Sequence, residues 1–276
     1  MYTLNCKGRL LVMDKPWVMG IINTTPDSFY EKSRKQEMDE ILQVAENMIQ
    51  EGADILDIGG QSTRPGSTRI SIQEEIDRTA PAIEHIMHEF PGALVSIDTF
   101  SSGVAKAAVK AGAAIINDIS AGNMDGEMIS TVASLHVPYI CMHMQGTPDT
   151  MQKNPRYENV TETVLDELIR KVDQCRKAGI HDIIIDTGFG FGKNIPQNFS
   201  LLKTLSAFRI IDRPLMVGLS RKSTIYKTLH TTADQALNGS TVLHTIALMN
   251  GADILRVHDV KAAKETVDLF MAYRNA

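Results

Sequence analysis

Short runs of apolar residues alternate with longer amphipathic stretches from one end of the chain to the other. Eight of the apolar runs have the length of buried strands, at residues 18–22, 55–58, 94–97, 114–117, 139–142, 183–186, 215–218 and 254–257. Between them, apolar residues recur with the spacing of one buried helix face at 38–50, 72–89, 103–110, 161–177 and 233–249. The pattern predicts a series of β–α units.

A glycine recurs where a predicted helix gives way to the next strand, at Gly52, Gly112, Gly179 and Gly251. Glycine favours this position because a helix commonly ends in the left-handed conformation. Eight such units in series, with no long linker between them, favour a closed barrel over an open sheet. We therefore expect an α/β fold, one (β/α)₈ TIM barrel forming a single domain over residues 1–276. Residues 2–14 are expected to form a short β-hairpin that closes the base of the barrel.

Composition and charge narrow the possible partners. The formal net charge is -5, and no basic stripe or run of like charges occurs, so nucleic acid and anionic membrane are not expected partners. No apolar run approaches the ~20 residues needed to span a bilayer, and the N-terminus lacks the layout of a secretion signal. The three cysteines (Cys6, Cys141 and Cys175) lie far apart, which indicates reduced thiols and a cytoplasmic protein.

Polar residues cluster where the predicted strands end, which is the edge of a TIM barrel that carries its chemistry. Asp98, Asn117 and Asp186 close three of the strands, and buried carboxylates and amides are costly unless paired. They predict a site for a flat ligand that bears several N–H and C=O groups. A basic group is expected on the opposite side of the mouth to bind an anion, above all phosphate, and it comprises Arg64, Lys222, Arg256 and His258.

Structural roles compete with these functional ones at several positions. Thr99, Ser120 and Ser223 are interpreted as helix N-caps, a place that Ser and Thr favour. Met142 is equally compatible with barrel packing and with a ligand wall. The glycine-rich segment 188–193 lacks the spacing of a phosphate-binding loop. We interpret it as a flexible turn that lets Phe191 reach the ligand.

Seven ordered motifs together resemble the dihydropteroate synthase family of pterin-binding enzymes, across nearly the whole chain. Any one of them alone would be weak, whereas seven in order are highly specific. They are Asn-Thr-Thr-Pro-Asp-Ser-Phe at 23–29, Asp-Ile-Gly-Gly-Gln-Ser-Thr-Arg-Pro-Gly at 57–66, Ser-Ile-Asp-Thr at 96–99, Asn-Asp-Ile-Ser at 117–120, Asp-Thr-Gly-Phe-Gly-Phe-Gly-Lys at 186–193, Gly-Leu-Ser-Arg-Lys at 218–222 and Arg-Val-His-Asp at 256–259.

The resemblance implies a transferase that joins (7,8-dihydropterin-6-yl)methyl diphosphate to p-aminobenzoate, giving 7,8-dihydropteroate and diphosphate in folate biosynthesis. By matching position it implies a pterin site whose members are Asp98, Asn117, Asp186, Lys222, Met142 and Phe191. The diphosphate would be bound by Asn23, Thr63, Arg256 and His258. The p-aminobenzoate pocket, for which a sulfonamide should compete, would be formed by Thr63, Arg64, Pro65, Phe29 and Ser223.

The implied mechanism needs no protein nucleophile, and its catalytic residues would be Asp98, Lys222 and Asn23. Asn23 would offer an amide oxygen to Mg²⁺, a hard ion that prefers oxygen donors and phosphates. Asp98 would stabilise the pterin methylene cation after the diphosphate departs. The resemblance also implies a homodimer that forms through the late helices.

One departure from the family and two rival functions bear on this reading. The first loop continues as Tyr-Glu-Lys-Ser at 30–33, where the family usually has a Ser-Asp-Gly-Gly type sequence, so Glu31 has no assigned role. A methyltetrahydrofolate-dependent methyltransferase would share the heterocycle site but would not need the basic groups. A catalytically dead pterin-binding protein is the second alternative, and only the altered loop favours it.

Overall fold

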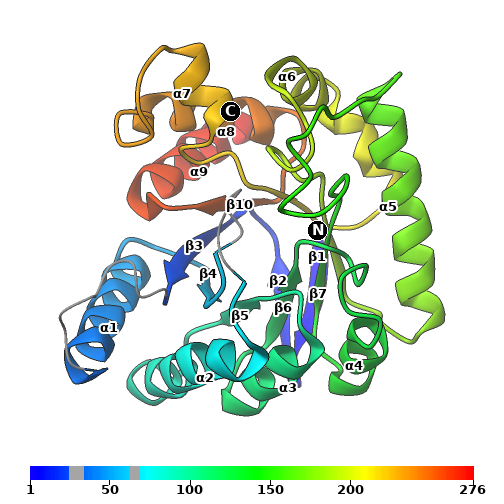
Figure 1. The fold of residues 1–276 in the computed structure, drawn as a ribbon. Coiled ribbons are helices and arrows are strands. Elements are labelled where there is room, and N and C mark those ends of the chain that lie inside the picture. Colours follow the sequence, from blue (N-terminus) through cyan, green and yellow to red (C-terminus); the bar gives the residue numbers. More distant parts are fainter. Residues whose placement is uncertain (25–33, 63–68) are drawn as a thin grey trace.

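Eight parallel strands close into a barrel, as the sequence predicts. The computed structural model describes residues 1–24, 34–62 and 69–276, apart from the side chains of 34 and 35. The strands follow one another round the barrel in chain order, and the last pairs with the first (Figure 1). They are β3 (Trp17–Asn23), β4 (Ile55–Gly59), β5 (Val95–Asp98), β6 (Ile115–Asp118), β7 (Tyr139–Met142), β8 (Ile183–Asp186), β9 (Leu215–Val217) and β10 (Ile254–Val257).

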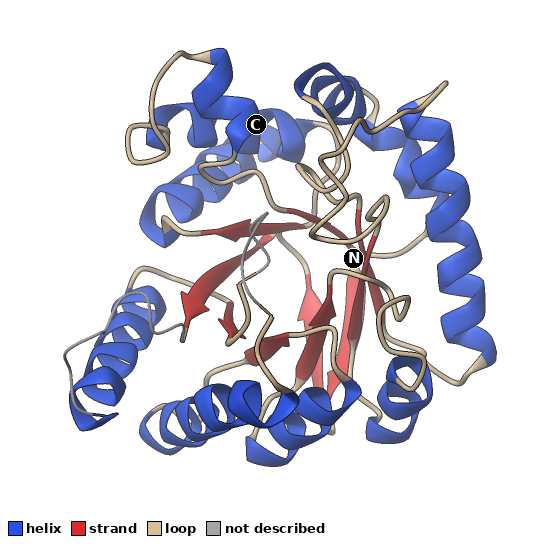
Figure 2. Cartoon of the chain, in the orientation of Figure 1, coloured by secondary structure: helices blue, strands red, loops and turns tan. Residues whose placement is uncertain are grey.

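Helices surround the strands on the outside of the barrel (Figure 2). Local signals set several of their starts: Ser71 accepts a hydrogen bond from the Glu74 amide, and Asn194 and Gln197 form a capping box. The helices are α1 (Arg34–Gln50), α2 (Ile72–Glu89), α3 (Ser102–Ala111), α4 (Met128–Leu135), α5 (Val160–Lys177), α6 (Ile195–Lys203), α7 (Ser223–Thr228), α8 (Leu237–Met249), α9 (Val260–Asn275) and the 3₁₀ helix η2 (Leu205–Ile211). No helix in the described part of the chain is long and apolar enough to span a membrane.

The helix predicted from residue 233 begins later, at Leu237. The carbonyl oxygens of Ala233 and Asp234 accept hydrogen bonds from the Arg221 guanidinium, at 3.0 and 2.6 Å. Those carbonyls would be needed by amides one turn further along if the helix began at 233. A long-range contact therefore delays the start of α8.

The predicted N-terminal hairpin is present and covers the base of the barrel. Strands β1 (Tyr2–Cys6) and β2 (Arg9–Met13) pair antiparallel, and both residues of their Lys7–Gly8 turn have positive φ, as a tight hairpin requires. Leu4, Cys6 and Met13 pack against the inward-facing apolar residues at the lower ends of the strands. The hairpin therefore seals one end of the barrel and leaves the other end for chemistry.

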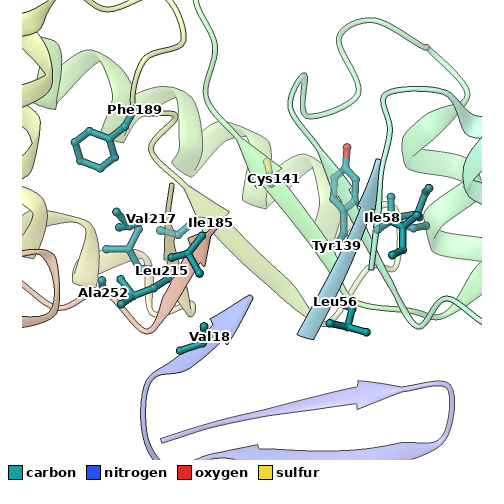
Figure 3. Close-up of a cluster of buried hydrophobic side chains, with 14 of the residues drawn as sticks. Val18, Leu56, Ile58, Tyr139, Cys141, Ile185, Phe189, Leu215, Val217 and Ala252 are labelled. Atoms are coloured by element: carbon teal, nitrogen blue, oxygen red, sulfur yellow. The ribbon is translucent and has the colours of Figure 1, made fainter. Parts of the chain in front are cut away.

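Two apolar layers hold the fold together. Alternate strand residues face outward and pack under the helices, as Val18, Leu56, Cys141 and Ile185 do in Figure 3. The residues between them face inward, and at the base they include Ile55, Ile115, Ile140, Ile184, Met216 and Ile254. The predicted glycine turns are confirmed, because all four glycines before the strands have φ between +94° and +131°.

Candidate active site

Polar side chains fill the carboxyl end of the barrel directly above the inward-facing apolar layer. Because strand side chains alternate, a residue two positions beyond a base residue faces the same interior. Asp57 follows Ile55 in this way, and Asn117, Asp186 and Arg256 follow Ile115, Ile184 and Ile254. Together with Asp98 at the end of β5, these side chains form the group that we call the mouth cluster.

Arg256 joins the two carboxylates of the mouth cluster. Its Nε donates to Oδ2 of Asp57 at 2.7 Å, and its Nη2 donates to Oδ2 of Asp98 at 2.6 Å. Although burial alone would lower the pKa of Arg256, the two carboxylates raise it above its usual value. The basic and acidic sides of the mouth, expected from the sequence to lie opposite one another, are therefore in direct contact.

Asp57 is a central residue of the mouth cluster that the sequence analysis did not single out. It is fully buried, and its Oδ2 also accepts a hydrogen bond from Nδ2 of Asn117 at 3.0 Å. Its Oδ1 has no hydrogen-bond partner among the described residues. Because Nδ2 of Asn117 is turned toward Asp57, the amide oxygen of Asn117 remains as an acceptor. The sequence signal that could have identified Asp57 is its position two residues after Ile55. The same two-residue step separates Asp186 from Ile184.

The two predicted pterin carboxylates are held in environments that favour their neutral forms. Burial raises the pKa of Asp98 to about 7; Arg256 opposes this shift, and Asp57 adds to it. Burial also raises the pKa of Asp186, opposed by the charge of Lys222. Oδ1 of Asp186 accepts the Gly188 amide at 2.8 Å, which fixes the orientation of this carboxylate. Such perturbed carboxylates are typical of functional sites.

Lys222 reaches the same region from the loop after β9. Its Nζ donates to the Phe189 carbonyl at 2.5 Å and lies 4.9 Å from the centre of the Phe191 ring. Burial lowers its pKa to about 8, opposed by the negative charge of Asp186. The structure therefore brings Lys222 together with Asp186 and Phe191, as the sequence predicts.

An apolar wall adjoins these polar groups. Met142, at the end of β7, and Phe191 belong to one cluster that also contains Ile119, Met144, Met151, Phe100 and Met124. Met142 thus packs at the mouth rather than in the base layer, and the cluster offers a flat ligand an apolar surface beside hydrogen-bonding groups.

The remaining predicted site residues lie at the rim or outside the described residues. Asn23 at the end of β3 and His258 after β10 are exposed, and Ser223 is the first residue of α7. Phe29, Thr63, Arg64 and Pro65, together with Glu31, fall outside the described residues. In the described part of the chain, no group of three or more His, Cys, Asp or Glu side chains could hold a metal ion.

The N-cap interpretation of three residues is wrong. The caps of α3, α4 and α7 are Ser101, Glu127 and Lys222 instead. Thr99 accepts the Ser101 amide, and the Ser120 hydroxyl donates to Asp118 at 2.7 Å. Both hydroxyls therefore stabilise the turn that follows a strand, before the helix begins.

The segment 188–193 forms the predicted turn between β8 and α6, and its glycines also serve a packing role. A Cβ at Gly188 would lie 1.9 Å from the His143 carbonyl oxygen, and one at Gly192 would lie 2.7 Å from that of Gln145. The glycines therefore permit close backbone packing, and the hydroxyl of Tyr157 donates to the Gly192 carbonyl at 2.8 Å. The segment therefore packs against His143 and Gln145, which follow β7 at the mouth.

Comparisons with known proteins agree with this geometry. The model of the pterin-binding enzyme family matches residues 19–258. A dihydropteroate synthase of Haemophilus influenzae is 41% identical over 275 residues, 99% of each chain. Among solved structures, that of the Yersinia pestis dihydropteroate synthase with a sulfonamide drug has a TM-score of 0.93 and 39% identity, covering 100% of both chains. The Xanthomonas albilineans dihydropteroate synthase with 4-aminobenzoic acid has a TM-score of 0.91 and 38% identity, covering 99% and 98%.

Proposed function

The chain belongs to the dihydropteroate synthase family of pterin-binding enzymes, and we propose that its mouth cluster binds the pterin and catalyses the family's transfer reaction. In this reaction p-aminobenzoate displaces diphosphate from (7,8-dihydropterin-6-yl)methyl diphosphate and forms 7,8-dihydropteroate. The observation that carries the proposal is the convergence of Asp98, Asn117 and Asp186 with Lys222 and Arg256 at one end of the barrel.

The pterin site follows from the hydrogen-bonding character of these groups. Asp186 uses Oδ1 for the Gly188 amide, and a carboxylate can accept further N–H groups, such as the guanidine-like edge of a pterin. Asn117 presents its amide oxygen, because its Nδ2 is committed to Asp57. Met142 and Phe191 would line the flat faces of the ring.

Arg256 and His258 would bind the diphosphate. A guanidinium has five N–H donors, and the ion pairs of Arg256 with Asp57 and Asp98 account for two of them. The exposed His258 lies two residues further along the same strand-to-helix connection. Thr63 is assigned here only from its place in the family motif.

Mg²⁺ is proposed as the cofactor, with Asn23 as its protein ligand. Mg²⁺ usually keeps several waters and takes one or two protein oxygens beside substrate phosphates. The exposed amide of Asn23, on a strand that pairs with β4 at the mouth, fits that requirement. When bound, the ion would supply positive charge that offsets the charge of the diphosphate.

The reaction then needs electrostatic stabilisation and positioning from the chain's own residues. The bond between the methylene carbon and the diphosphate oxygen breaks, and its electron pair leaves with the diphosphate, toward which Arg256 would direct N–H donors. Ionised Asp98 would stabilise the positive charge left on the pterin. The arylamine nitrogen bonds to the methylene carbon and releases a proton. Ser223, with Phe29, Thr63, Arg64 and Pro65, would form the p-aminobenzoate pocket, in which a sulfonamide would compete.

A homodimer is proposed through the face formed by α8 and α9. Val242, Ile246, Met249, Leu269 and Tyr273 are exposed apolar side chains on these two helices. Several of them border a groove of about 310 Å³ between the helices. Burial of such a surface against a second copy would remove apolar area from water. Light scattering of wild type and Met249→Glu tests this, and a wild-type monomer would refute it.

Two further proposals concern the organisation and location of the chain. We propose that residues 1–276 form one pterin-binding domain, which the continuous core under the helices supports. A cytoplasmic location is supported by three buried cysteines that form no disulfide.

Diphosphate release tests the proposed function. Purified protein is given the pterin diphosphate and Mg²⁺, with and without p-aminobenzoate, and both dihydropteroate and diphosphate are quantified. We expect equal amounts of the two products when both substrates are present. Pterin binding without turnover would contradict the proposal.

A further inference from the structure

A buried lysine outside the mouth cluster holds the segment 188–193 in place. Lys193 is 2% exposed, and its Nζ donates to the Gly188 carbonyl at 2.9 Å, to the Phe191 carbonyl at 3.0 Å and to Nδ1 of His143 at 2.9 Å. An ammonium has three N–H groups, so these bonds use all of them. A neutral amine has only two, so it could keep all three contacts only if His143 donated to it from Nδ1.

His143 connects this lysine to a negative charge on the outside of the barrel. While Lys193 is protonated, Nδ1 of His143 must accept, so the imidazole proton resides on Nε2. Nε2 lies 3.3 Å from Oε2 of Glu167, a half-exposed residue of α5. Burial lowers the pKa of Lys193 to about 7, and the nearby imidazole of His143 lowers the pKa of Glu167. A buried ammonium is costly without compensation; the negative charge of Asp186 supplies the larger share of it, and Glu167 adds a smaller one.

The segment that Lys193 anchors provides the carbonyl and the ring that Lys222 contacts. The Phe189 carbonyl accepts from Lys222 Nζ, and the Phe191 ring lies beneath it. Lys193 bonds to the carbonyls on either side of this pair of contacts, at Gly188 and at Phe191. Displacement of the segment would therefore move the carbonyl and the ring that fix the Lys222 ammonium.

We propose that Lys193, supported by His143 and Glu167, is a positioning residue that sets Lys222 for pterin binding. The inference rests on the proposed role of Lys222 in the pterin site. Glu167 acts as a remote electrostatic support, because its charge faces Lys193, whereas the charged groups that face Lys222 are Asp186, Arg256 and Asp98. The remaining charges that face Lys193 are Asp186 and Lys222.

Steady-state kinetics of three variants test the inference. In Lys193→Met, the Gly188 and Phe191 carbonyls lose their donor, and we expect the KM for the pterin diphosphate to rise by about tenfold or more, the scale of one charged hydrogen bond. The KM for p-aminobenzoate should not change. In Glu167→Gln the segment keeps its contacts and Lys193 keeps the charge of Asp186, but Lys193 loses the smaller compensating charge of Glu167. The alkaline limb of kcat/KM should therefore move to lower pH. The matched control is Asp166→Asn, an exposed neighbour on the same helix, which should behave as wild type.

The outcomes separate this inference from the proposed function. If Lys193→Met and Glu167→Gln keep the wild-type pterin KM and alkaline limb, the positioning role is wrong; if Lys193→Met does not fold, Glu167→Gln alone decides. A wild-type protein without turnover would instead refute the proposed function. The positioning role would then be judged by calorimetry with 6-hydroxymethyl-7,8-dihydropterin. Weaker binding in Glu167→Gln would support it, and equal binding would overturn it.

Discussion

On β8, Ile184 and Asp186 face the same barrel interior two residues apart, yet they belong to two different layers, the apolar base and the polar mouth. Ile184 packs in the sealed base, and Asp186 lies in the mouth cluster. The same step separates Ile55 from Asp57 and Ile254 from Arg256. The inward-facing positions of one strand therefore supply both the apolar base and the polar mouth. The apolar base contributes stability, on the order of 2–5 kcal/mol for each large side chain, which allows the mouth to keep buried charges that are costly to the fold.

Carboxylates occur at both ends, and their partners distinguish them. At the base, Asp54 accepts the Val18 amide at 2.8 Å and Asp253 accepts the Leu215 amide at 2.9 Å, so both bind backbone N–H groups between strands. At the mouth, Asp57 and Asp98 pair with the side chain of Arg256. Asp54 and Asp253 thus join neighbouring strands, whereas Asp57 and Asp98 hold a cation whose remaining N–H groups can bind a charged ligand.

The largest expected effect comes from Asp57→Asn. The change keeps the shape of the side chain but removes the charge that orients Arg256 and the amide of Asn117. We expect kcat/KM for the pterin diphosphate to fall by about 100-fold, as for breaking a buried ion pair. The KM for p-aminobenzoate should remain the same. Unchanged kcat/KM in steady-state assays would show that Asp57 is merely a buried structural carboxylate.

The pH dependence sharpens the comparison, because burial raises the pKa of carboxylates at both ends, whereas only the mouth groups are expected to contact the substrate. Pterin binding is expected to need ionised Asp98, whose pKa is about 7, and protonated Lys222, whose pKa is about 8. The value of kcat/KM should therefore rise with pH through about 7, and it should fall as Lys193, whose pKa is about 7, and then Lys222 lose their protons. In Lys222→Arg the fall should become less steep, because arginine stays charged and Lys193 alone still loses its proton. A profile that is flat across the neutral range would contradict this assignment.

The smallest effect is expected from Asp54→Asn, the same substitution three residues before Asp57. The amide oxygen can still accept the Val18 N–H group, so the free energy of unfolding should change by about 1 kcal/mol or less. We expect wild-type kinetics for both substrates. Chemical denaturation measures the first quantity, and a loss of kcat/KM would show that the two ends are coupled.

Local patterns were sufficient to predict most of the fold. Strands at 139–142, 183–186 and 254–257 and the helix at 72–89 match the structure at both ends. Buried parallel strands are continuous apolar runs, and amphipathic helices show their periodicity plainly, so neither depends on distant residues. The late start of α8 was missed because it depends on a contact from Arg221.

The convergence of the candidate residues could be predicted from the sequence, but their contacts with one another could not. Asp98, Asn117, Asp186, Lys222 and Arg256 lie at one end of the barrel as expected, because each is near the carboxyl end of a strand; their roles in binding and catalysis stay predictions. The pairing of Arg256 with Asp57 and Asp98 joins residues 199 and 158 positions apart, which local sequence does not encode. Lys193 was missed for a related reason: a buried lysine and a surface lysine look alike in sequence.

The central claim, that neighbouring inward positions on one strand separate binding from stability, is tested most directly on β8. Pterin affinity by calorimetry and free energy of unfolding by denaturation are measured for Asp186→Asn and Ile184→Ala. We expect Asp186→Asn to weaken pterin binding by about 100-fold, through the loss of charged hydrogen bonds, with a smaller loss of stability than Ile184→Ala. Ile184→Ala should lose about 2–5 kcal/mol of stability and keep wild-type affinity while folded. Wild-type affinity in Asp186→Asn would contradict the account.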